Sequence, residues 1–543
     1  MQGCSRRRFL QSCAAGGLTL ALRSVYAAAP AEKRPRPNVV MIVIDDLNDY
    51  VTGMGGHPQA QTPHMAALAA SGVQFRRAYS NNPICAPSRG SLFTGIYPHT
   101  SRLIHFGVWY ENEVLANSNT LMEYFQAKGY RTLGTGKLMH HHRPQGWDEY
   151  GYVANYGPFA FDGKQTVGHP SVPEPFRSIG AVDGSFAPLS DVPSVPKSEK
   201  APGYTGWIDT PNWKVRRPVR YVSETDRDPL PDERCAAWAV ERICRMGKEM
   251  SEKPFFLAVG FIRPHTPLYA PKRFFDMFPL ETVQLPVIKQ GDADDTHYKD
   301  VFTADQKGPR YFRLLKESYR TVEEGLRNYA RAYLACVSFV DEQVGKVVDA
   351  VDHSGLANNT IVLLTSDNGY NLGQKDYLFK NSLWEESGRV PLIIRAPGVA
   401  RAGGVVEHPV SLIDIYPTLA DLCSLEGDTR KNAMGAPPDG KSLRPFLVNP
   451  ETETWDGPDG ALTVIHAQGR SSEKPYEHHY SLRTRRWRYT LYNDGGEELY
   501  NHDADPREWT NLAETQSYAE VKAGLKAQLF RMTGRPMSAL GVS

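Results

Sequence analysis

The stretch Asn38-Val39-Val40-Met41-Ile42-Val43-Ile44-Asp45-Asp46 predicts the first strand of this 543-residue chain. Its uninterrupted apolar, mostly β-branched run is typical of a parallel strand that is buried on both faces. Two carboxylates follow the run directly. Because ligands of open α/β sheets bind beyond the carboxyl ends of the strands, we expect Asp45 and Asp46 to belong to a functional site.

Two similar apolar runs occur later in the chain, and each ends in polar side chains. Residues 255–261 are followed by Arg263-Pro264-His265, and residues 361–365 by Ser366-Asp367-Asn368-Gly369. Helical periodicity lies between these runs, at residues 63–71, 121–128, 232–250, 328–353 and 413–423. Alternating strands and helices predict an α/β fold with a doubly wound sheet. The three polar clusters should then meet at one edge of that sheet.

Residues 153–230 interrupt this alternation. They are rich in Pro, Gly, Trp and Tyr and show little periodicity. We interpret them as an insertion over the active face that supplies substrate contacts; a purely structural loop is the alternative.

The pattern changes again after Gly440. Residues 480–484 and 487–492 alternate like antiparallel strands, with a turn at 493–496, a further short strand at 498–501 and a closing helix at 518–533. The sequence therefore predicts a catalytic domain over residues 36–440. A smaller C-terminal α+β subdomain with an antiparallel sheet should cover residues 441–543.

The composition is that of an ordinary globular enzyme, with 41% hydrophobic and 23% charged residues. A formal net charge of +1 gives no reason to expect a nucleic-acid partner.

The first thirty residues have the features of a targeting segment. Ser5-Arg6-Arg7-Arg8-Phe9-Leu10-Gln11 resembles a twin-arginine export signal, and Val25-Tyr26-Ala27 has the spacing of a signal-peptidase site. The apolar stretch between them, residues 13–22, is shorter than the roughly 20 residues that span a bilayer, although a membrane anchor is the alternative. We expect a signal peptide over residues 1–30, export through the twin-arginine machinery to the periplasm or the medium, and no membrane span in the mature protein.

The chain has seven cysteines, of which Cys4 and Cys13 lie in the signal. Cys235 and Cys244 fall in one predicted helix, which separates their Cα atoms by about 13 Å, too far for a disulfide. A scaffold held together by disulfides is therefore not expected.

The pentapeptide Cys85-Ala86-Pro87-Ser88-Arg89 lies in a short polar, Pro-rich stretch. It resembles the Cys-x-Pro-x-Arg motif of the type I sulfatases. The resemblance implies that a formylglycine-generating or sulfatase-maturing enzyme oxidises Cys85 to the aldehyde formylglycine. A buried, unreactive cysteine is the alternative.

Asp45, Asp46, Asp367 and Asn368 offer hard oxygen ligands, which suit Ca²⁺ or Mg²⁺ better than zinc. Caps of the following helices are the alternative role for such residues. The sulfatase resemblance implies one Ca²⁺ at these four positions, with the modified Cys85 as a further ligand. Iduronate-2-sulfatases proper often have His where this chain has Asn368.

Basic residues complete the resemblance. Gly136-Lys137-Leu138-Met139-His140 matches the family's Gly-Lys-x-x-His element, Arg263-Pro264-His265 its basic-Pro-His segment, and Lys380 its last lysine. By resemblance, Arg89 holds the aldehyde residue, and Lys137, Lys380 and His265 hold the sulfate. His265 or Lys380 protonates the leaving oxygen, and His140 accepts a proton when sulfate is released. Solvated lysines and structural histidines are the alternatives. His141 and His142 should face the pocket or the solvent.

The resemblance covers most of residues 36–535 and is closest to the iduronate-2-sulfatase branch, at residues 94–103, 124–130 and 371–373. It implies an alkaline-phosphatase-like fold and hydrolysis of a carbohydrate sulfate ester, from a glycosaminoglycan or another polysaccharide. We interpret Trp109, Trp384 and Glu385 as sugar contacts; burial in the core is the alternative for the tryptophans. Two rival functions remain: a phosphodiesterase or phosphonate monoester hydrolase on the same scaffold, and an inactive, glycan-binding homologue.

Overall fold

The computed structural model describes residues 36–211, 215–249, 253–471 and 473–535. The predicted signal peptide lies outside these ranges. The catalytic and C-terminal parts belong to one compact unit that begins at Arg36. The domain boundary at residue 440 and the bounds of the insertion stay predictions.

A mixed sheet with strand order β20-β2-β19-β16-β1-β14-β3-β4 forms the centre, and β21 pairs with β2. The strands are β1 (Asn38–Ile44), β2 (Val73–Tyr79), β3 (Arg131–Gly136), β4 (Glu149–Val153), β14 (Phe255–Phe261), β16 (Thr360–Ser366), β19 (Arg389–Arg395), β20 (Gly404–Val406) and β21 (Val410–Ser411). β1 runs parallel to both β14 and β16, whereas β19 runs antiparallel to its neighbours β16 and β2. The predicted α/β sheet is confirmed.

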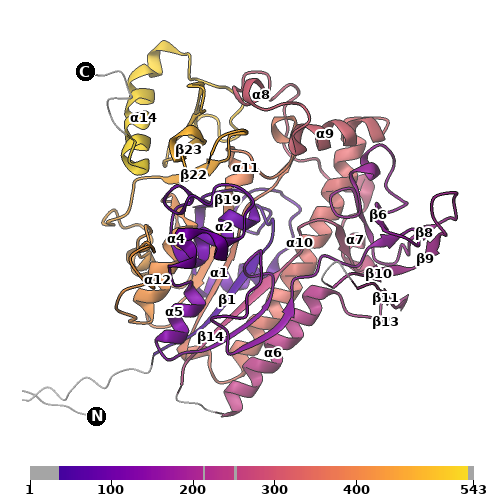
Figure 1. Ribbon diagram of the computed structural model, residues 1–543, viewed down its shortest axis with the longest axis horizontal. Helices are drawn as coiled ribbons and strands as arrows, with labels where there is room; N and C mark the ends of the chain where they lie inside the picture. The colour runs from indigo at the N-terminus through magenta and orange to yellow at the C-terminus, as the bar shows by residue number, and fades with distance from the viewer. Residues whose placement is uncertain (1–35, 212–214, 250–252, 472, 536–543) are drawn as a thin grey trace, which may run out of the picture. The chain divides into compact units, whose positions relative to one another are not determined.

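Side chains of β1 alternate between two hydrophobic cores, which explains its continuous apolar sequence. Val40, Ile42 and Ile44 pack in the core that contains α1 (Pro63–Ser71), α6 (Pro231–Glu249) and α10 (Val322–His353). Val39, Met41 and Val43 pack in the core that contains α2 (Cys85–Thr94), α5 (Leu121–Ala127) and α12 (Ile415–Leu422). Figure 1 shows α6 and α10 on one side of the sheet and α5 and α12 on the other.

Most predicted helices occur close to their expected bounds, and α1 matches them. Helix α10 begins at Val322 rather than at 328, because the Thr321 hydroxyl accepts a hydrogen bond from the Glu324 amide and caps an earlier turn. The remaining helices are α3 (Pro98–Ser101), α4 (Glu113–Ala116), α7 (Lys272–Asp276), α8 (Tyr298–Val301), α9 (Lys307–Ser318), α11 (Glu385–Gly388), α13 (Arg444–Val448) and α14 (Ala519–Thr533). Short 3-10 turns are η1 (Trp109–Glu111), η2 (Phe176–Ile179), η3 (Leu280–Thr282), η4 (Ala357–Asn359), η5 (Gln374–Asp376), η6 (Leu412–Asp414), η7 (Pro475–Glu477) and η8 (Gln516–Tyr518).

Short paired strands make up the segment 153–230, which accounts for its weak periodicity. They are β5 (Ala160–Phe161), β6 (Thr166–Val167), β7 (Phe186–Pro188), β8 (Ser194–Val195), β9 (Tyr204–Thr205), β10 (Trp207–Asp209), β11 (Arg217–Val219), β12 (Tyr221–Ser223) and β13 (Asp226–Arg227). β7 pairs with β15 (Leu268–Ala270), and this pairing joins the segment to the chain that follows β14.

The C-terminal part contains an antiparallel sheet of order β22-β23-β24-β25, as predicted. Its strands are β22 (Ala461–Ile465), β23 (His479–Arg483), β24 (Trp487–Leu491) and β25 (Glu497–Asn501), and α14 packs in the same core. β22 contacts the catalytic part, since the Val464 amide donates to the Asn81 carbonyl at 2.9 Å and Thr463 Oγ1 to the Ser80 carbonyl at 2.7 Å. The C-terminal sheet therefore supports the loop that leads into Cys85.

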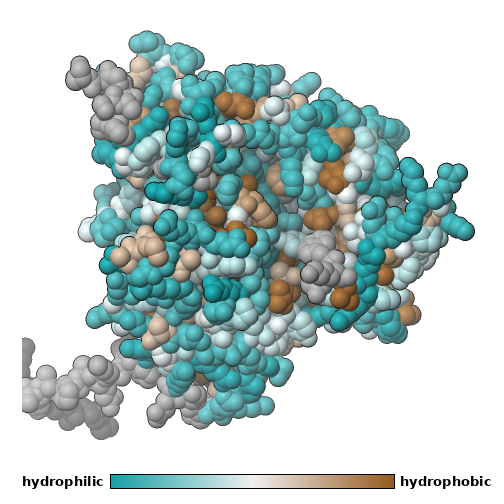
Figure 2. Space-filling model, viewed as in Figure 1, coloured by the Kyte–Doolittle hydropathy of each residue, from teal (hydrophilic) through white to brown (hydrophobic). Residues whose placement is uncertain are grey.

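Within the described ranges, no helix has both the length and the apolar character needed to cross a bilayer. The five cysteines of those ranges are free, which confirms that Cys235 and Cys244 are not bridged. Hydrophilic residues cover most of the face shown in Figure 2, and hydrophobic ones gather toward its middle.

Candidate active site

The carboxyl ends of adjacent parallel strands meet at one edge of the sheet. Asp45 and Asp46 follow β1, while Asp367 and Asn368 follow β16, whose Ser366 pairs with Ile44. Lys137 follows β3, and the segment 263–265 follows β14. The expected convergence of the polar clusters is therefore observed.

Cys85 is the first residue of α2, so its side chain lies where the first helical amides have no partner within the helix. It is 3% exposed, and its Sγ lies 3.5 Å from Lys380 Nζ. Burial opposes ionisation of this thiol, but Lys137 and Lys380 lower its pKa below the ordinary value. Cys85 is therefore held in a positively charged surrounding.

Arg89 lies one turn after Cys85 on α2 and is fully buried. Its Nε donates to Asp367 Oδ2 at 2.7 Å, its Nη2 lies 3.4 Å from Asp45 Oδ1, and its Nη1 donates to the Leu138 carbonyl at 2.8 Å. The guanidinium thus joins the helix that carries Cys85 to the ends of three strands.

The oxygen ligands predicted for a metal lie together and are buried. One ligand atom each of Asp45, Cys85 and Asp367 lies within 4.8 Å of the other two. Asp46 is adjacent, and its φ of 59°, unusual for a residue other than glycine, turns the chain sharply at the strand end. Burial raises the pKa of Asp367 to about 7, although the Arg89 guanidinium opposes this. This cluster of buried carboxylates needs positive charge nearby, and Arg89 supplies part of it.

Asn368 provides the test of whether these residues fit a metal ion. Its Nδ2 donates to Asp46 Oδ1 at 2.8 Å and to the Gly369 carbonyl at 2.9 Å. Its Oδ1 is buried and finds no hydrogen-bond partner among the described residues. Because an orphan buried acceptor costs about 1–3 kcal/mol, this amide oxygen beside carboxylates fits a hard cation such as Ca²⁺.

Lys137 and Lys380 lie close to the carboxylates. Lys137 Nζ makes a close ion pair with Asp45 Oδ2, and Lys380 Nζ makes one with Asp46 Oδ1. Burial opposes their charge, but the paired carboxylates raise the pKa of both lysines, so both ammonium groups stay charged. Neither lysine is the solvated surface charge that was the alternative.

The two histidines differ in their hydrogen bonds. His265 Nδ1 donates to the Thr266 carbonyl at 2.6 Å, which leaves Nε2 to face Asp46 Oδ2 at 3.7 Å. His140 Nδ1 has no hydrogen-bond partner within the described chain. Burial, with Lys137 adding to it, lowers the pKa of His140 to about 3, so its ring is neutral. Of its neighbours, His141 contacts the exposed Phe106 ring and His142 packs on Tyr150.

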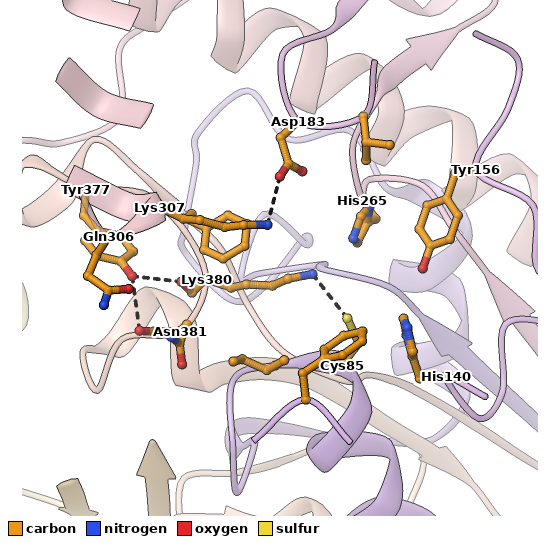
Figure 3. Close-up of a pocket in the computed structure, with 14 residues that line it drawn as sticks. Cys85, His140, Tyr156, Asp183, His265, Gln306, Lys307, Tyr377, Lys380 and Asn381 are labelled. Atoms are coloured by element: carbon orange, nitrogen blue, oxygen red, sulfur yellow. Dashed lines mark hydrogen bonds and ion pairs between the residues drawn. The ribbon is translucent and has the colours of Figure 1, made fainter. Parts of the chain in front are cut away.

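A cavity of about 660 Å³ opens over these groups. Figure 3 shows Cys85, His140, Tyr156, His265 and Lys380 around it, together with Asp183, which is paired with Lys307. The lining residues are Ile84, Cys85, Phe106, His140, Tyr156, Val182, Asp183, His265, Gln306, Lys307, Tyr377, Phe379, Lys380 and Asn381. Sequence reasoning missed the lining residues other than Cys85, His140, His265 and Lys380; the composition of segment 153–230 was the one signal for Tyr156, Val182 and Asp183.

The structure does not bring Trp109, Trp384 or Glu385 to this cavity, and their interpretation as sugar contacts is corrected. Trp109 is 3% exposed, and its Nε1 donates to the His141 carbonyl at 2.9 Å. Trp384 is 1% exposed and donates to Glu498 Oε2 at 3.1 Å. Glu385 is buried in ion pairs with Arg483 and Arg488. Both indole rings therefore pack in the core, which was the alternative role for the tryptophans.

Comparisons with known proteins show which families and structures this chain is similar to. The family model described as Sulfatase matches residues 37–425, and the one described as N-sulphoglucosamine sulphohydrolase, C-terminal, matches residues 373–535. A sulfatase of Formosa agariphila is 33% identical over 506 residues, which cover 91% of this chain and 86% of the relative. Iduronate 2-sulfatase of Mus musculus is 28% identical over 76% of this chain and 72% of its own length.

Solved structures share the fold at lower identity. A phosphonate monoester hydrolase from Silicibacter pomeroyi superposes with a TM-score of 0.66 at 22% identity, covering 92% of this chain and 96% of that one. A protein solved in complex with its substrate D-glucosamine-2-N,6-O-disulfate superposes with a TM-score of 0.62 at 20% identity, covering 92% and 99%. The predicted alkaline-phosphatase-like fold is confirmed. On the family match and the Formosa relative, the chain belongs to the sulfatase family and is a sulfuric ester hydrolase.

Proposed function

We propose that this sulfatase hydrolyses a sulfate ester of a carbohydrate through a formylglycine residue formed from Cys85, with one bound Ca²⁺. The observation that carries the proposal is the position of Cys85. It begins α2, lies beside Asp45 and Asp367, and is 3.5 Å from the Lys380 ammonium. An unreactive cysteine in the core is normally surrounded by apolar groups, whereas a reactive one lies close to positive charge.

Asp45, Asp46, Asp367 and Asn368 would hold the ion, together with the modified side chain at position 85. The orphan Asn368 Oδ1 and the crowded carboxylates support an oxygen-coordinated cation there. When bound, Ca²⁺ and formylglycine would supply an acidified hydroxyl as the nucleophile.

The remaining side chains bind sulfate and move protons. Lys380 and His265 face the cavity, and Lys137 lies behind its wall; the positive charge of the two lysines suits a sulfate ester. A proton for the leaving sugar oxygen would come from Lys380 Nζ, or from Nε2 of His265 when that ring is protonated, since its Nδ1–H donates to a carbonyl. Neutral His140 would accept a proton when sulfate is released.

The cavity supports a sugar as the group that carries the sulfate. Sugars stack on aromatic rings and hydrogen-bond through their hydroxyls, and the wall offers both kinds of group. Phe106, Tyr377 and Phe379 are the rings, and Asp183 and Gln306 are polar partners for hydroxyls. The name of the mouse relative, iduronate 2-sulfatase, favours a glycosaminoglycan or another acidic polysaccharide oligosaccharide.

A phosphonate monoester hydrolase or phosphodiesterase is the second candidate, favoured by the likeness to the Silicibacter enzyme. Such enzymes more often use His and Asp ligands for a second metal. Among the described residues, the other group with metal-ligand spacing, Glu385, His502 and Glu508, does not line the cavity and is neutralised by Arg483 and Arg488. An inactive glycan-binding homologue is disfavoured by the completeness of the site.

Two assays test the proposal. One measures sulfate release from defined glycosaminoglycan and algal oligosaccharides, and the other compares the hydrolysis rates of an aryl sulfate and the matching aryl phosphate. We expect sulfate release and a preference for the aryl sulfate. Faster phosphate hydrolysis would favour the second candidate, and glycan binding without sulfate release would favour the inactive homologue.

Export by the twin-arginine route belongs to the same proposal. Replacement of Arg6 and Arg7 by Lys should leave the enzyme inside the cell.

A further inference from the structure

A second cavity adjoins the catalytic one. Its volume is about 730 Å³, and His140 and Tyr156 line both cavities. Figure 3 shows these two residues on the same side of Cys85. Sites for small ligands have volumes of about 300–1,000 Å³, so each cavity alone is large enough for a sugar. Together, the two cavities have room for a sulfated sugar and for the sugar that is linked to it.

An exposed aromatic side chain lines the second cavity. Tyr152 lies in β4 and is 47% exposed, and its neighbour Val153, which also lines the cavity, is 52% exposed. Exposed apolar side chains that gather at a cavity are typical of binding sites, whereas scattered ones are not. The Tyr152 ring therefore gives this cavity a surface on which a sugar ring can stack.

Two arginines that line the second cavity form no ion pair with a described carboxylate. Arg217, in β11, is exposed, and Arg234, in α6, is partly exposed with its Nε donating to the Pro229 carbonyl at 3.1 Å. In contrast, Arg220 of the same segment is paired with Asp226. The two guanidinium groups are therefore available to an anion that comes from outside the chain.

Asp209 and Asp232 are the described carboxylates that line the second cavity, and both accept hydrogen bonds from N–H groups of the chain. Asp232 accepts from the amides of Ile262 and Arg263 at 2.8 and 2.9 Å, and Asp209 accepts from the side-chain amide of Asn155. Asp209 is 8% exposed and Asp232 is 2% exposed. An anion that enters from solvent therefore meets the arginines, because the carboxylates are buried.

We propose that the second cavity binds the sugar unit next to the sulfated one, and that Arg217 and Arg234 bind an anionic group of that sugar, a carboxylate or a second sulfate. A guanidinium suits this role because it can donate two parallel hydrogen bonds to either anion. The inference rests on the proposed sulfatase function. It adds that the substrate is an acidic oligosaccharide and not a single sulfated sugar.

Kinetic measurements on matched substrates test the inference. The same sulfated sugar is supplied alone, linked to a neutral sugar, linked to a uronic acid, and linked to a second sulfated sugar. For wild type, kcat/KM should be about 10-fold higher with an anionic neighbour than with the neutral one, the effect of one charge-assisted hydrogen bond. A preference for either anionic neighbour supports the inference, and the stronger preference identifies the anion.

Arg217→Gln and Arg234→Gln should remove this preference by raising KM. Hydrolysis of the single sulfated sugar should stay unchanged, because neither arginine lines the catalytic cavity. Arg220→Gln is the matched control, since Arg220 is exposed in the same segment but is paired with Asp226 and does not line the second cavity. Tyr152→Ala should raise KM about 5-fold for all linked substrates, neutral or acidic, because it removes the stacking surface.

Three results would overturn the inference. These are equal wild-type kcat/KM with neutral and anionic neighbours, the same loss in Arg220→Gln, and a loss in Arg217→Gln and Arg234→Gln that extends to the single sugar. A wild-type protein without sulfatase activity would instead contradict the proposed function. Calorimetric binding of a hyaluronan tetrasaccharide, which carries carboxylates and no sulfate, then still tests the second cavity. Weaker binding by Arg217→Gln than by wild type supports the inference, and equal binding overturns it.

Discussion

Nε of Arg89 lies 2.7 Å from Oδ2 of Asp367, and this bond ties helix α2 to the end of strand β16. Cys85 begins the same helix, and Asp45, which also contacts the guanidinium, directly follows the neighbouring strand β1. The spacing between the cysteine and the carboxylates therefore depends on one buried side chain.

Arg89→Lys should abolish most activity while keeping the charge. Lysine cannot reach both carboxylates with a planar fork, and a misplacement of about 1 Å at a catalytic site can cost about 100-fold in rate. Steady-state rates and thermal unfolding of the variant test this. Arg488→Lys is the control, since Arg488 is as deeply buried but pairs with Glu385 and Glu508. It should lower the unfolding temperature and leave kcat unchanged; wild-type kcat in Arg89→Lys would contradict the account.

Asn368→Ala should weaken calcium binding. The variant loses the buried Oδ1 that has no hydrogen-bond partner in the described chain. For wild type stripped with a chelator, Ca²⁺ at about 100 times its dissociation constant should stabilise the fold by about 2.7 kcal/mol. The variant should need a Ca²⁺ concentration at least about 10-fold higher for the same shift in unfolding temperature. Glu508→Gln, in the other acidic group, should retain the wild-type titration, and an unchanged titration in Asn368→Ala would exclude Asn368 as a ligand.

Phe106 is the aromatic side chain we expect to contact the sugar. It is 55% exposed, lines the cavity, and packs its ring against His140 at 4.4 Å. Phe106→Ala should raise KM for a sulfated sugar about 5–10-fold, as expected for one aromatic contact worth about 1 kcal/mol. Trp109→Phe should lower the unfolding temperature but leave KM unchanged, because Trp109 is buried. Equal effects of the two substitutions on KM would argue against Phe106 as a sugar contact.

Glu508 should make stability depend on pH below the neutral range. Burial disfavours its carboxylate, but Arg488 and His502 lower its pKa to about 2. The unfolded value is about 4.3, so the stabilisation is complete above about pH 4.3 and is lost as the pH falls through about 2. Glu508→Gln should cost about 3–5 kcal/mol near pH 7. Thermal unfolding of both proteins should show this difference shrinking from about pH 4 downward; a difference that does not change with pH would contradict it.

The parts of the fold that the sequence predicted are those with a local signal. Strand β1 and strand β14 occur at their predicted bounds because burial on both faces leaves a continuous apolar run. Strand β2, Val-Gln-Phe-Arg-Arg-Ala-Tyr, was missed because it carries charged residues toward the edge of the sheet. Helix α2 was missed because Pro87 and its small polar residues do not show helical periodicity.

The residues of the candidate site likewise fall into those that the sequence predicted and those that it did not. The strand-end acids could be predicted because parallel topology brings carboxyl ends together, and the motif residues because they resemble the sulfatase pattern. The burial of Trp384 and Glu385 could not, since it depends on Arg488 and Glu498 of the C-terminal sheet, more than a hundred residues away. The contact of Tyr156 with Lys137 likewise exists only in the folded chain.

The chemical state of residue 85 tests the central claim most directly. Mass analysis of the peptide that contains Cys85, taken from active enzyme, should show the aldehyde in place of the thiol, and the aldehyde fraction should rise and fall with specific activity across preparations. Cys85→Ala should abolish activity. Active protein in which residue 85 is found only as a thiol would contradict the account.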